Sequence, residues 1–300
     1  MKLLIWGAGS LGLMLLDTIE RIDPNAELAW LADNLPRGTV HQGLTVFGDR
    51  HALKRAAAEG WQLALALGQA GHRHQALGLA RAANIPLLSL IDPVALVSSR
   101  AQIAPGCLVM PSAIVNAGAV LDEGVLVHNQ ALISHHVRLG EAVSVFPGAR
   151  LLGGSQVGIG VSIGAGALVL PGMAIGEWAT IAPATVVMED IEARTLVAGN
   201  PARTVQRLAD IDVPRLFPMA EPECMDLRLQ NCLRAVWGRI PSPELPWELG
   251  LTPEWDSLAH LRLVAEVEAR FSLRLSQAEI LSLKDLPSLK AILTQHGVTL

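Results

Sequence analysis

Two adjacent histidines, His135 and His136, carry the side chains of this chain that are best suited to acid–base chemistry. Imidazole changes its protonation near neutral pH, so a histidine can take a proton from an incoming hydroxyl or amine. Neighbouring residues of an extended segment point to opposite sides. The pair therefore predicts a base with a helper, two metal ligands, or solvated residues of a turn.

A second group of candidate residues surrounds a glycine-rich turn near the N-terminus. The sequence LLIWGAGSLG forms Gly-x-Gly-x-x-Gly between a predicted strand and a predicted helix over 13–22. Glycines let the backbone approach a phosphate at a helix N-terminus, and an acid after the second strand suits a ribose or base. The residues expected to bind substrate are Gly9, Ser10, Leu11, Asp33 and Gly68.

The composition limits the classes of function. The chain has 300 residues, enough for two or three domains, and 51% of them are hydrophobic. A formal charge of −5 lacks the basic excess that is typical of nucleic-acid-binding proteins. Three cysteines argue against a disulfide framework and predict a cytoplasmic protein. No apolar stretch is long enough to predict a membrane span.

The strongest pattern is a repeat of six residues between Val97 and Val187. Every sixth residue in this range is Val, Ile or Leu, sixteen in all. Glycine often follows three positions later, and a small residue often follows four positions later. Self-similarity at a fixed period is typical of a repeat architecture.

Each hexad predicts one short strand and one corner. The aliphatic side chain points inward, the small residue packs beside it, and glycine supplies the positive φ of the corner. Three such sides close a triangular coil, so the segment predicts a hexapeptide β-helix. The corner positions are the second and third after each aliphatic residue, which places His135 and His136 outward after Ile133.

The N-terminal segment predicts strands over 28–33, 62–68 and 86–91 and a second helix over 71–83. Only about 90 residues precede the repeat, which is room for one mononucleotide-binding half rather than two. An NAD site, a nucleotide-sugar site and a purely architectural module remain open.

The repeat, which ends in VAGNPAR (Val197–Arg203), resembles the left-handed β-helix acyltransferases. The left-handed winding is an exception to the right-handed crossover rule and is taken from this family. With the N-terminal module and the sequence IDPVALVSSRAQIAPGCLVMPSAIVNAGAV, residues 1–205 look like bacterial sugar acetyltransferases that O-acetylate sialic acid or N-acetylate UDP-linked amino sugars. The resemblance implies a nucleotide-sugar acceptor, an acyl thioester donor and a homotrimer with active sites between neighbouring helices.

The resemblance also implies roles for residues of the repeat. In this family the base is the histidine of a hydrophobic-x-His-acid stretch. His135 matches it, and His136 stands where the acid belongs. Glu141 or Glu123 is then expected to orient His135. Gly153 matches the glycine whose N–H holds the thioester carbonyl and its oxyanion.

The donor side of the implied site departs from the family pattern. Ser144 stands where the family has a second histidine, and Pro183 stands where it has a glycine beside the cofactor. Ala165 matches a position that lines the adenine pocket. On the acceptor side, Leu11 replaces a histidine, which removes a polar contact to the sugar nucleotide.

A zinc site is the metal alternative. Trimeric β-helix carbonic anhydrases bind zinc with three histidines from two chains, and His128, His135 and His136 are the corresponding candidates. The VAGNPAR ending and the N-terminal module do not belong to that class, so we expect no metal.

Helical periodicity replaces the hexads in the last part of the chain. Helices are predicted over 225–238, 256–275, 276–281 and 283–295. Asp256 is a suitable N-cap for the second helix. The apolar face expected of this helix consists of Leu258, Leu261, Val264, Val267 and Phe271.

The sequence WDSLAHLRLVAEVEARF resembles the acyl carrier protein signature, and the resemblance spans residues 225–296. It implies a 4′-phosphopantetheine arm on Ser257, attached by a phosphopantetheinyl transferase and charged by an acyl-loading enzyme. A helix N-terminus favours the phosphate of such an arm.

The sequence thus predicts an α/β half-Rossmann domain (1–92), a left-handed parallel β-helix (93–208), a linker (209–224) and a four-helix acyl carrier bundle (225–300). The predicted activity is transfer of an acetyl or other short acyl group, in bacterial surface glycan synthesis, to an amino or hydroxyl group of a sugar or nucleotide-sugar. The donor is acetyl-CoA or the acyl thioester on Ser257. Two alternatives remain: the β-helix uses free acetyl-CoA while the carrier recruits a partner enzyme, or the chain is a non-catalytic scaffold.

Overall fold

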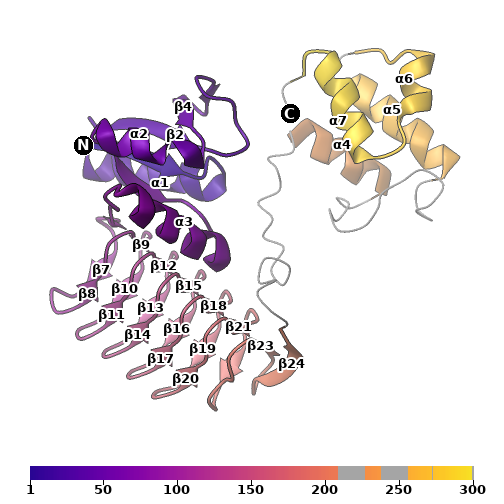
Figure 1. The fold of residues 1–300 in the computed structure, drawn as a ribbon. Coiled ribbons are helices and arrows are strands. Elements are labelled where there is room, and N and C mark those ends of the chain that lie inside the picture. Colours follow the sequence, from indigo (N-terminus) through magenta and orange to yellow (C-terminus); the bar gives the residue numbers. More distant parts are fainter. Residues whose placement is uncertain (209–226, 238–255, 272, 299–300) are drawn as a thin grey trace. The chain divides into compact units, whose positions relative to one another are not determined.

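The computed structural model describes residues 1–208, 227–237, 256–271 and 273–298 (Figure 1). Contacts divide the chain into two units, Met1–Ala220 and Glu221–Leu300. The predicted linker over 209–224 lies outside the described residues.

The first unit begins with a five-stranded sheet in the order β3-β4-β2-β1-β5. Its elements are β1 (Lys2–Trp6), α1 (Ser10–Ile22), β2 (Glu27–Leu31), β3 (Val40–His41), β4 (Leu44–Gly48), the 3-10 turn η1 (Arg50–Ala52), α2 (Leu53–Ala58), β5 (Gln62–Leu65) and α3 (Ala70–Ala83). All pairings are parallel except that of β3 with β4. The strand and helix order is that expected of half a Rossmann domain. The sequence did not predict β3, β4 and α2, because such short elements carry too few residues for a clear period.

Three parallel sheets then form a β-helix (Figure 1). Face 1 consists of β7 (Leu96–Val97), β10 (Ile114–Val115), β13 (Leu132–Ile133), β16 (Arg150–Leu151), β19 (Leu168–Val169) and β22 (Val186–Val187). Face 2 consists of β8 (Gln102–Ile103), β11 (Val120–Leu121), β14 (Arg138–Leu139), β17 (Gln156–Val157) and β20 (Ala174–Ile175). Face 3 consists of β6 (Leu90–Ile91), β9 (Leu108–Val109), β12 (Leu126–Val127), β15 (Ser144–Val145), β18 (Ser162–Ile163), β21 (Thr180–Ile181), β23 (Thr195–Ala198) and β24 (Arg203–Arg207).

The hexad prediction is confirmed strand by strand. Each of the sixteen aliphatic residues from Val97 to Val187 is the second residue of a two-residue strand. Strands on one face pair 18 residues apart, as Leu132 does with Arg150. From Cys107 to Val197 the inward aliphatic residues and the small residues beside them form one buried core.

The corners lie along three edges of the β-helix. Edge 1 joins face 1 to face 2, edge 2 joins face 2 to face 3, and edge 3 joins face 3 to face 1. Backbone hydrogen bonds connect corners one coil apart along each edge, as from the N–H of Gly154 to the carbonyl of His135 at 3.0 Å on edge 1. The predicted positive φ is present at the corner glycines, for example +76° at Gly154.

The β-helix ends with a shorter coil. Strand β23 pairs in parallel with β21, but Ile181 lies opposite Val197, two residues short of a full coil. Strand β24 then folds back antiparallel to β23. The VAGNPAR segment is thus the turn that closes the last coil.

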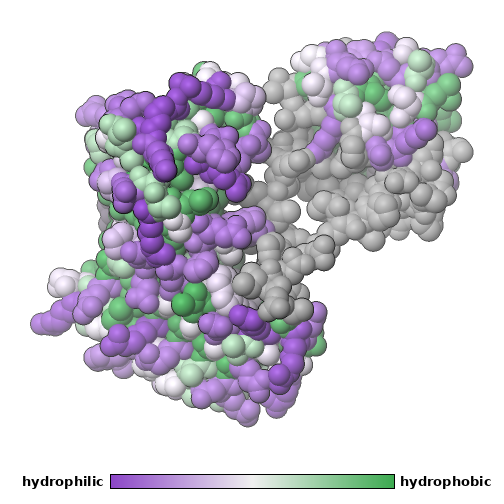
Figure 2. Space-filling model, viewed as in Figure 1, coloured by the Kyte–Doolittle hydropathy of each residue, from purple (hydrophilic) through white to green (hydrophobic). Residues whose placement is uncertain are grey.

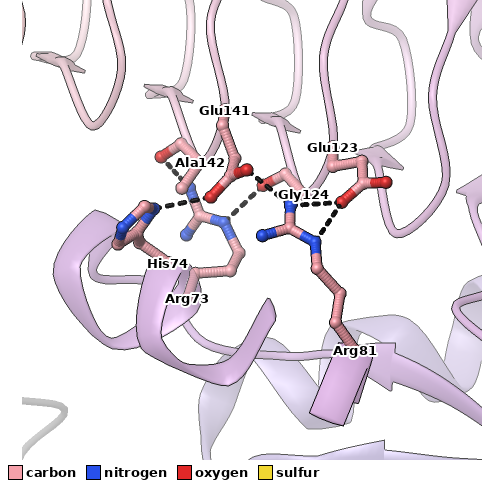
Figure 3. A network of polar contacts seen from close by, with 7 residues as sticks. All are labelled: Arg73, His74, Arg81, Glu123, Gly124, Glu141 and Ala142. Atoms are coloured by element: carbon pink, nitrogen blue, oxygen red, sulfur yellow. Dashed lines mark hydrogen bonds and ion pairs between the residues drawn. The ribbon is translucent and has the colours of Figure 1, made fainter. Parts of the chain in front are cut away.

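Arg73 of α3 connects the N-terminal layer, which is the sheet and helices from β1 to α3, to the β-helix (Figure 3). Its guanidinium is fully buried and donates to the carbonyl oxygens of Gly124 at 2.6 Å and Ala142 at 2.8 Å. It also donates to the carbonyl of Gly68 at 3.1 Å and the hydroxyl of Ser144 at 2.8 Å. Burial lowers the pKa of Arg73 to about 10, so the group remains a cation at neutral pH.

Charged side chains extend this junction along edge 2 (Figure 3). Arg81 forms ion pairs with both Glu123 and Glu141. The Nδ1 atom of His74 lies 2.6 Å from a carboxylate oxygen of Glu141. The ring of His74 packs edge-on against that of Trp178, with 5.4 Å between the ring centroids. Helix α3 therefore covers edge 2.

A second junction joins α1 to the start of the β-helix. The carboxylate of Asp92 is buried and accepts hydrogen bonds from Thr18 at 2.6 Å and from Arg21 at 2.6 and 3.1 Å. Strand β6 has already joined face 3 at Leu90, ahead of the predicted boundary at 92. Two polar junctions therefore connect the N-terminal sheet and its helices to the β-helix.

The described residues of the second unit form four helices. They are α4 (Leu227–Trp237), α5 (Ser257–Phe271), α6 (Gln277–Ser282) and α7 (Leu286–Gln295). Their shared core includes Leu229, Leu263, Val267 and Leu289. Asp256 caps α5 as predicted, since its carboxylate accepts the N–H of Ala259 at 2.8 Å.

The predicted apolar face of α5 needs a correction. Val264, Val267 and Phe271 are buried, but Leu258 and Leu261 are 56% and 61% exposed. The core instead contains Leu263, which was not among the residues of the predicted apolar face. Figure 2 shows hydrophobic side chains among hydrophilic ones on the surface of this unit.

Within the described ranges, no helix combines the length and the apolar character that a membrane crossing requires.

Candidate active site

The two histidines of edge 1 form the centre of the candidate site. His135 and His136 are both exposed, as the hexad register predicted. Their Nδ1 atoms lie 3.2 Å apart, and their rings meet at an interplanar angle of 78°. Since the Nδ1 atoms face each other, the Nε2 atom of His135 is the nitrogen left for another partner.

Glycines in the neighbouring coils make room for the two rings. The imidazole of His135 lies over Gly153 in the next coil, where a Cβ atom would come within 2.3 Å of Cε1 and 2.6 Å of Nε2. The imidazole of His136 lies over Gly118 in the preceding coil, where a Cβ atom would come within 2.8 Å of Cδ2. The base candidate and the backbone of Gly153 are therefore direct neighbours.

The main chain at Gly153 offers a donor beside His135. The carbonyl of Gly153 accepts a hydrogen bond from the N–H of Gly172, and the N–H of Gly154 donates to the main-chain carbonyl of His135. Among the backbone hydrogen bonds of residues 1–208, none has the N–H of Gly153 as its donor. A basic nitrogen and an N–H group side by side can bind an acyl group and the nucleophile that attacks it.

The glycine-rich turn of the N-terminal layer is built by close packing. A Cβ atom at Gly7 would lie 2.4 Å from the carbonyl oxygen of Ala66, and one at Gly12 would lie 2.2 Å from that of Gly7. Gly9 precedes α1, and Ser10 is its exposed first residue. Leu11 is buried in the core, so its side chain does not reach the surface of the turn.

Asp33 lies at the carboxyl end of β2, as expected, and holds Arg50. The guanidinium of Arg50 donates to both carboxylate oxygens, at 2.9 and 3.0 Å. Burial raises the pKa of Asp33, but the hydrogen bonds and charge of Arg50 lower it more, so its net pKa lies below the usual range. Gly68, the other residue predicted to bind substrate here, follows the carboxyl end of β5. Its carbonyl accepts hydrogen bonds from Arg73 and Ser144.

Solved structures of acetyltransferases are similar to this chain. The acetyltransferase domain of PglB from Neisseria gonorrhoeae, solved with acetyl coenzyme A, is 33% identical, with 68% of this chain and 98% of that domain covered and a TM-score of 0.64. PerB from Caulobacter crescentus, solved with CoA and GDP-perosamine, is 27% identical, with coverage of 69% and 98% and a TM-score of 0.64. The chain belongs to the hexapeptide-repeat acyltransferases.

WeeI from Acinetobacter baumannii, at 20% identity and a TM-score of 0.64, shares the fold. A scan against protein-family models gives no match for this acyltransferase, and a search of curated proteins gives no significant one. About a third of the chain lies outside the alignments with PglB and PerB.

Two residues expected to bind the donor lie apart from the histidine pair of this acyltransferase. Ser144 has no exposed surface, and its hydroxyl accepts the hydrogen bond from Arg73. In this structure Ser144 is thus a residue of the junction with Arg73 and has no surface of its own to offer a donor. Ala165 is exposed, but it lies on edge 3 with Pro147 and Pro183 rather than on edge 1.

The acidic partner expected for His135 needs a second correction. Glu123 and Glu141 lie on edge 2, where Arg81 binds both and His74 binds Glu141. They cannot orient a ring on edge 1. The partner of His135 in this acyltransferase is His136.

His128 is separate from the histidine pair. It is buried on face 3, and its ring stacks on Phe146 with 5.6 Å between centroids. Burial, together with the nearby charge of Arg73, lowers the pKa of His128 to about 4. Within one chain His128 therefore lies apart from the exposed pair His135 and His136.

Three residues at these sites were not singled out from the sequence: Arg73, Arg50 and His41. The ring of His41 reaches across from β3, with its Nε2 atom 3.1 Å from the carbonyl of Ala8 in the glycine-rich turn. The spacing of Arg73 and Arg81, two helical turns apart, was the available signal for a polar helix face. Nothing in the sequence indicated which edge of the β-helix that face would cover.

Proposed function

We propose that this acyltransferase moves an acetyl or other short acyl group from a pantetheine thioester to an amino or hydroxyl group of a sugar or nucleotide-sugar, in bacterial surface glycan synthesis. The observation that carries the proposal is the imidazole of His135 lying over the backbone of Gly153. The likeness to a PglB domain solved with acetyl coenzyme A, and to PerB solved with CoA and GDP-perosamine, supports the donor and acceptor classes.

The proposed mechanism needs one base and one oxyanion donor. Nε2 of His135 takes the proton from the acceptor as its nitrogen or oxygen bonds to the thioester carbon. The N–H of Gly153 donates to the oxygen that becomes negative. The tetrahedral intermediate then breaks its C–S bond, and the departing thiolate takes the proton from His135, which returns the base to its starting state.

The N-terminal layer is proposed to hold the nucleotide part of the acceptor. Gly9 and Ser10 begin α1, whose N-terminus favours a phosphate. Asp33 and Arg50 lie at the carboxyl end of β2, the side of an open α/β sheet where ligands bind. Because Leu11 is buried, its side chain contributes no contact to such a ligand.

A homotrimer is proposed because face 1 carries an apolar outer row. The outward side chains of its strands are Leu96, Ile114, Leu132, Arg150, Leu168 and Val186, all aliphatic except one. Leu96 is exposed and the other aliphatic residues of the row are half-buried. A continuous apolar row at the surface is typical of an interface. Face 1 lies between edge 1 with His135 and edge 3 with Ala165, so a neighbouring copy can complete the donor site.

The second unit is proposed to be an acyl carrier domain with 4′-phosphopantetheine on Ser257. Ser257 is the first residue of α5, and the exposed Asp256 caps that helix. A helix start of this kind fits a phosphodiester. The group would supply a thiol that carries the acyl chain, and tethering would raise the donor concentration at edge 1. A phosphopantetheinyl transferase and an acyl-loading enzyme are the partners this implies.

A second candidate function keeps the same reaction but takes free acetyl-CoA as the donor, while the carrier recruits a partner enzyme. The PglB domain solved with acetyl coenzyme A favours it. The third possibility, a non-catalytic scaffold, predicts no acyl transfer from any donor.

The test uses the full chain, acetyl-CoA and GDP-perosamine or a UDP-linked amino sugar, with thiol release as the readout. We expect His135→Ala to lower the rate at least about 100-fold. Gln130→Ala, at an exposed corner of edge 3, is the control. Equal transfer by His135→Ala and wild type would refute the assignment of the base.

The donor is tested separately by mass spectrometry after incubation with a phosphopantetheinyl transferase and CoA. We expect one phosphopantetheine on wild type and none on Ser257→Ala. An unmodified wild-type chain would refute the proposal that the donor is tethered to Ser257. A modified chain whose Ser257→Ala variant transfers equally well from acetyl-CoA would favour the second candidate function.

A further inference from the structure

The contact between the two imidazoles restricts where their protons lie. A hydrogen bond between two Nδ1 atoms 3.2 Å apart needs one N–H and one lone pair. In the neutral pair one ring therefore carries hydrogen on Nδ1, and the other carries it on Nε2. Only the arrangement with hydrogen on Nδ1 of His135 leaves its Nε2 free to accept a proton.

The backbone holds His136 in a conformation that favours this contact. Its φ is +58°, in the left-handed region, where the same corner of the next coil has Gly154. Positive φ alone does not mark a role, because Gln130 and Ser112 also adopt it. At His136, however, the ring also packs on Gly118 and turns its Nδ1 toward His135.

The surroundings of the pair leave each imidazole as the other's main polar partner. The corners directly before and after it on edge 1 are Ala117–Gly118 and Gly153–Gly154, which have no titratable side chain. The outward positions of the flanking strands carry two charged residues, Arg138 on face 2 and Arg150 one coil later on face 1. Within residues 1–208 no carboxylate forms an ion pair with either ring.

We propose that His136 is the positioning residue of His135: its Nδ1 accepts the Nδ1–H of His135 and thereby keeps Nε2 of His135 unprotonated. This inference rests on the proposed function. It assigns to a neutral imidazole the task of a tautomer-fixing acceptor. A proton added to Nε2 of His135 blocks the base directly. A proton added to Nδ1 of His136 makes Nδ1 of His135 the acceptor, which places the hydrogen of His135 on Nε2 and blocks the base as well.

Two variants at one position separate this role from a structural one. His136→Gly removes the acceptor without adding strain at positive φ, and His136→Asn restores an acceptor and tolerates that φ. We expect the Gly variant to lower kcat about tenfold to 100-fold with little change in KM. We expect the Asn variant to recover most of that loss. Gln130→Gly and Gln130→Asn are the matched controls, at the same corner position on edge 3.

A spectroscopic measurement tests the tautomer without any substrate. Long-range ¹H–¹⁵N NMR of ¹⁵N-histidine-labelled full chain at pH 8, with His135→Ala to assign the signal, reports which ring nitrogen is protonated. We expect an unprotonated Nε2 for His135 in wild type and in His136→Asn. In His136→Gly we expect a mixture of tautomers.

The outcomes separate the two proposals. Unchanged kcat and an unchanged tautomer in His136→Gly would overturn the inference and make His136 a solvated corner residue. A protonated Nε2 on His135 in wild type would overturn it as well. If His135→Ala remains active, the proposed function fails, while the NMR result still decides the role of His136.

Discussion

At the scale of single residues, the site depends on what lies one coil away. His135 contacts Gly153, and His136 contacts Gly118, each 18 residues distant. Both rings lie along edge 1, so the residue one coil away decides whether each ring fits. The same residues in an irregular fold would have no such fixed neighbour.

Gly153→Ala tests this contact. The new Cβ atom would lie 2.3 Å from Cε1 of His135 and must displace the ring. We expect acyl transfer to fall by up to about 100-fold, because small displacements of a reacting group have effects of that size. The fold should survive, since Ala117 and Ala165 occupy the same corner position naturally. Transfer kinetics and thermal unfolding are the measurements, and an unchanged rate would contradict the geometry.

His128 gives a prediction for the pH dependence of stability. Its pKa falls to about 4 in the folded chain, below that of an unfolded histidine. The unfolded state therefore binds the proton first, and the free energy of unfolding decreases as pH falls from about 6.5 to 4, by at most about 1.4 kcal/mol per pH unit. His128→Phe, which can keep the stacking on Phe146, should remove this part of the slope. Urea unfolding at pH 7.5 and pH 5 measures it, and equal slopes in variant and wild type would contradict the prediction.

At the scale of elements, helix α3 joins the two layers of the first unit. Arg73 enters the junction fully buried, whereas Arg81 makes its ion pairs at the surface. The charge of Arg73 is balanced by carbonyl dipoles of both layers rather than by a carboxylate. A buried cation of this kind stabilises only while all its acceptors stay in place.

Arg73→Met and Arg81→Met compare these two arginines on one helix. Arg73→Met leaves several buried oxygens without a donor, so we expect the free energy of unfolding to fall by about 3 kcal/mol or more. Arg81→Met removes half-exposed ion pairs and should change it by less than about 1 kcal/mol. Urea denaturation of both variants at pH 7.5 is the measurement. A similar loss in both would mean that the buried contacts of Arg73 add little.

The sequence predicted the elements that carry their own period. The hexads determined the strands, their register and the outward position of His135 and His136, because each coil repeats the same inward and outward pattern. Contacts between different elements were not predictable in this way. Glu123 and Glu141 were expected beside His135, although their corners belong to the edge that α3 covers.

The α5 helix shows a related limit. Leu258 and Leu261 fit an apolar period, yet they are exposed, and Leu263 is buried instead. A helical period identifies a stripe but does not say which neighbouring stripe meets the other helices. For the same reason the sequence did not indicate that Ser144 would lie under Arg73.

At the scale of the whole molecule, the apolar outer row on face 1 is the feature that one chain leaves unexplained. Leu132→Asp and Leu168→Asp place a charge in that row at positions next to Arg150. If face 1 is the interface of a homotrimer, we expect both variants to sediment as smaller species and to lose acyl transfer. Leu79→Asp, on the exposed side of α3, is the control.

Analytical ultracentrifugation of the full chain, with the transfer assay on the same samples, gives the answer. Trimers in all three variants would exclude face 1 from the interface. A wild-type chain that sediments as a monomer but remains active would show that His135 and Gly153 need no neighbouring copy.

The 18-residue register also limits how this protein can change in length during evolution. His135 and Gly153 stay in contact only if the segment between them is one full coil, so an insertion or deletion of a single hexad there would move Gly153 to a different edge. Outside residues 117–154, coils can be gained or lost without separating the two residues. The shortened coil at β23 lies in that tolerant part. Relatives of different length should therefore differ above or below the histidine corner and keep its spacing.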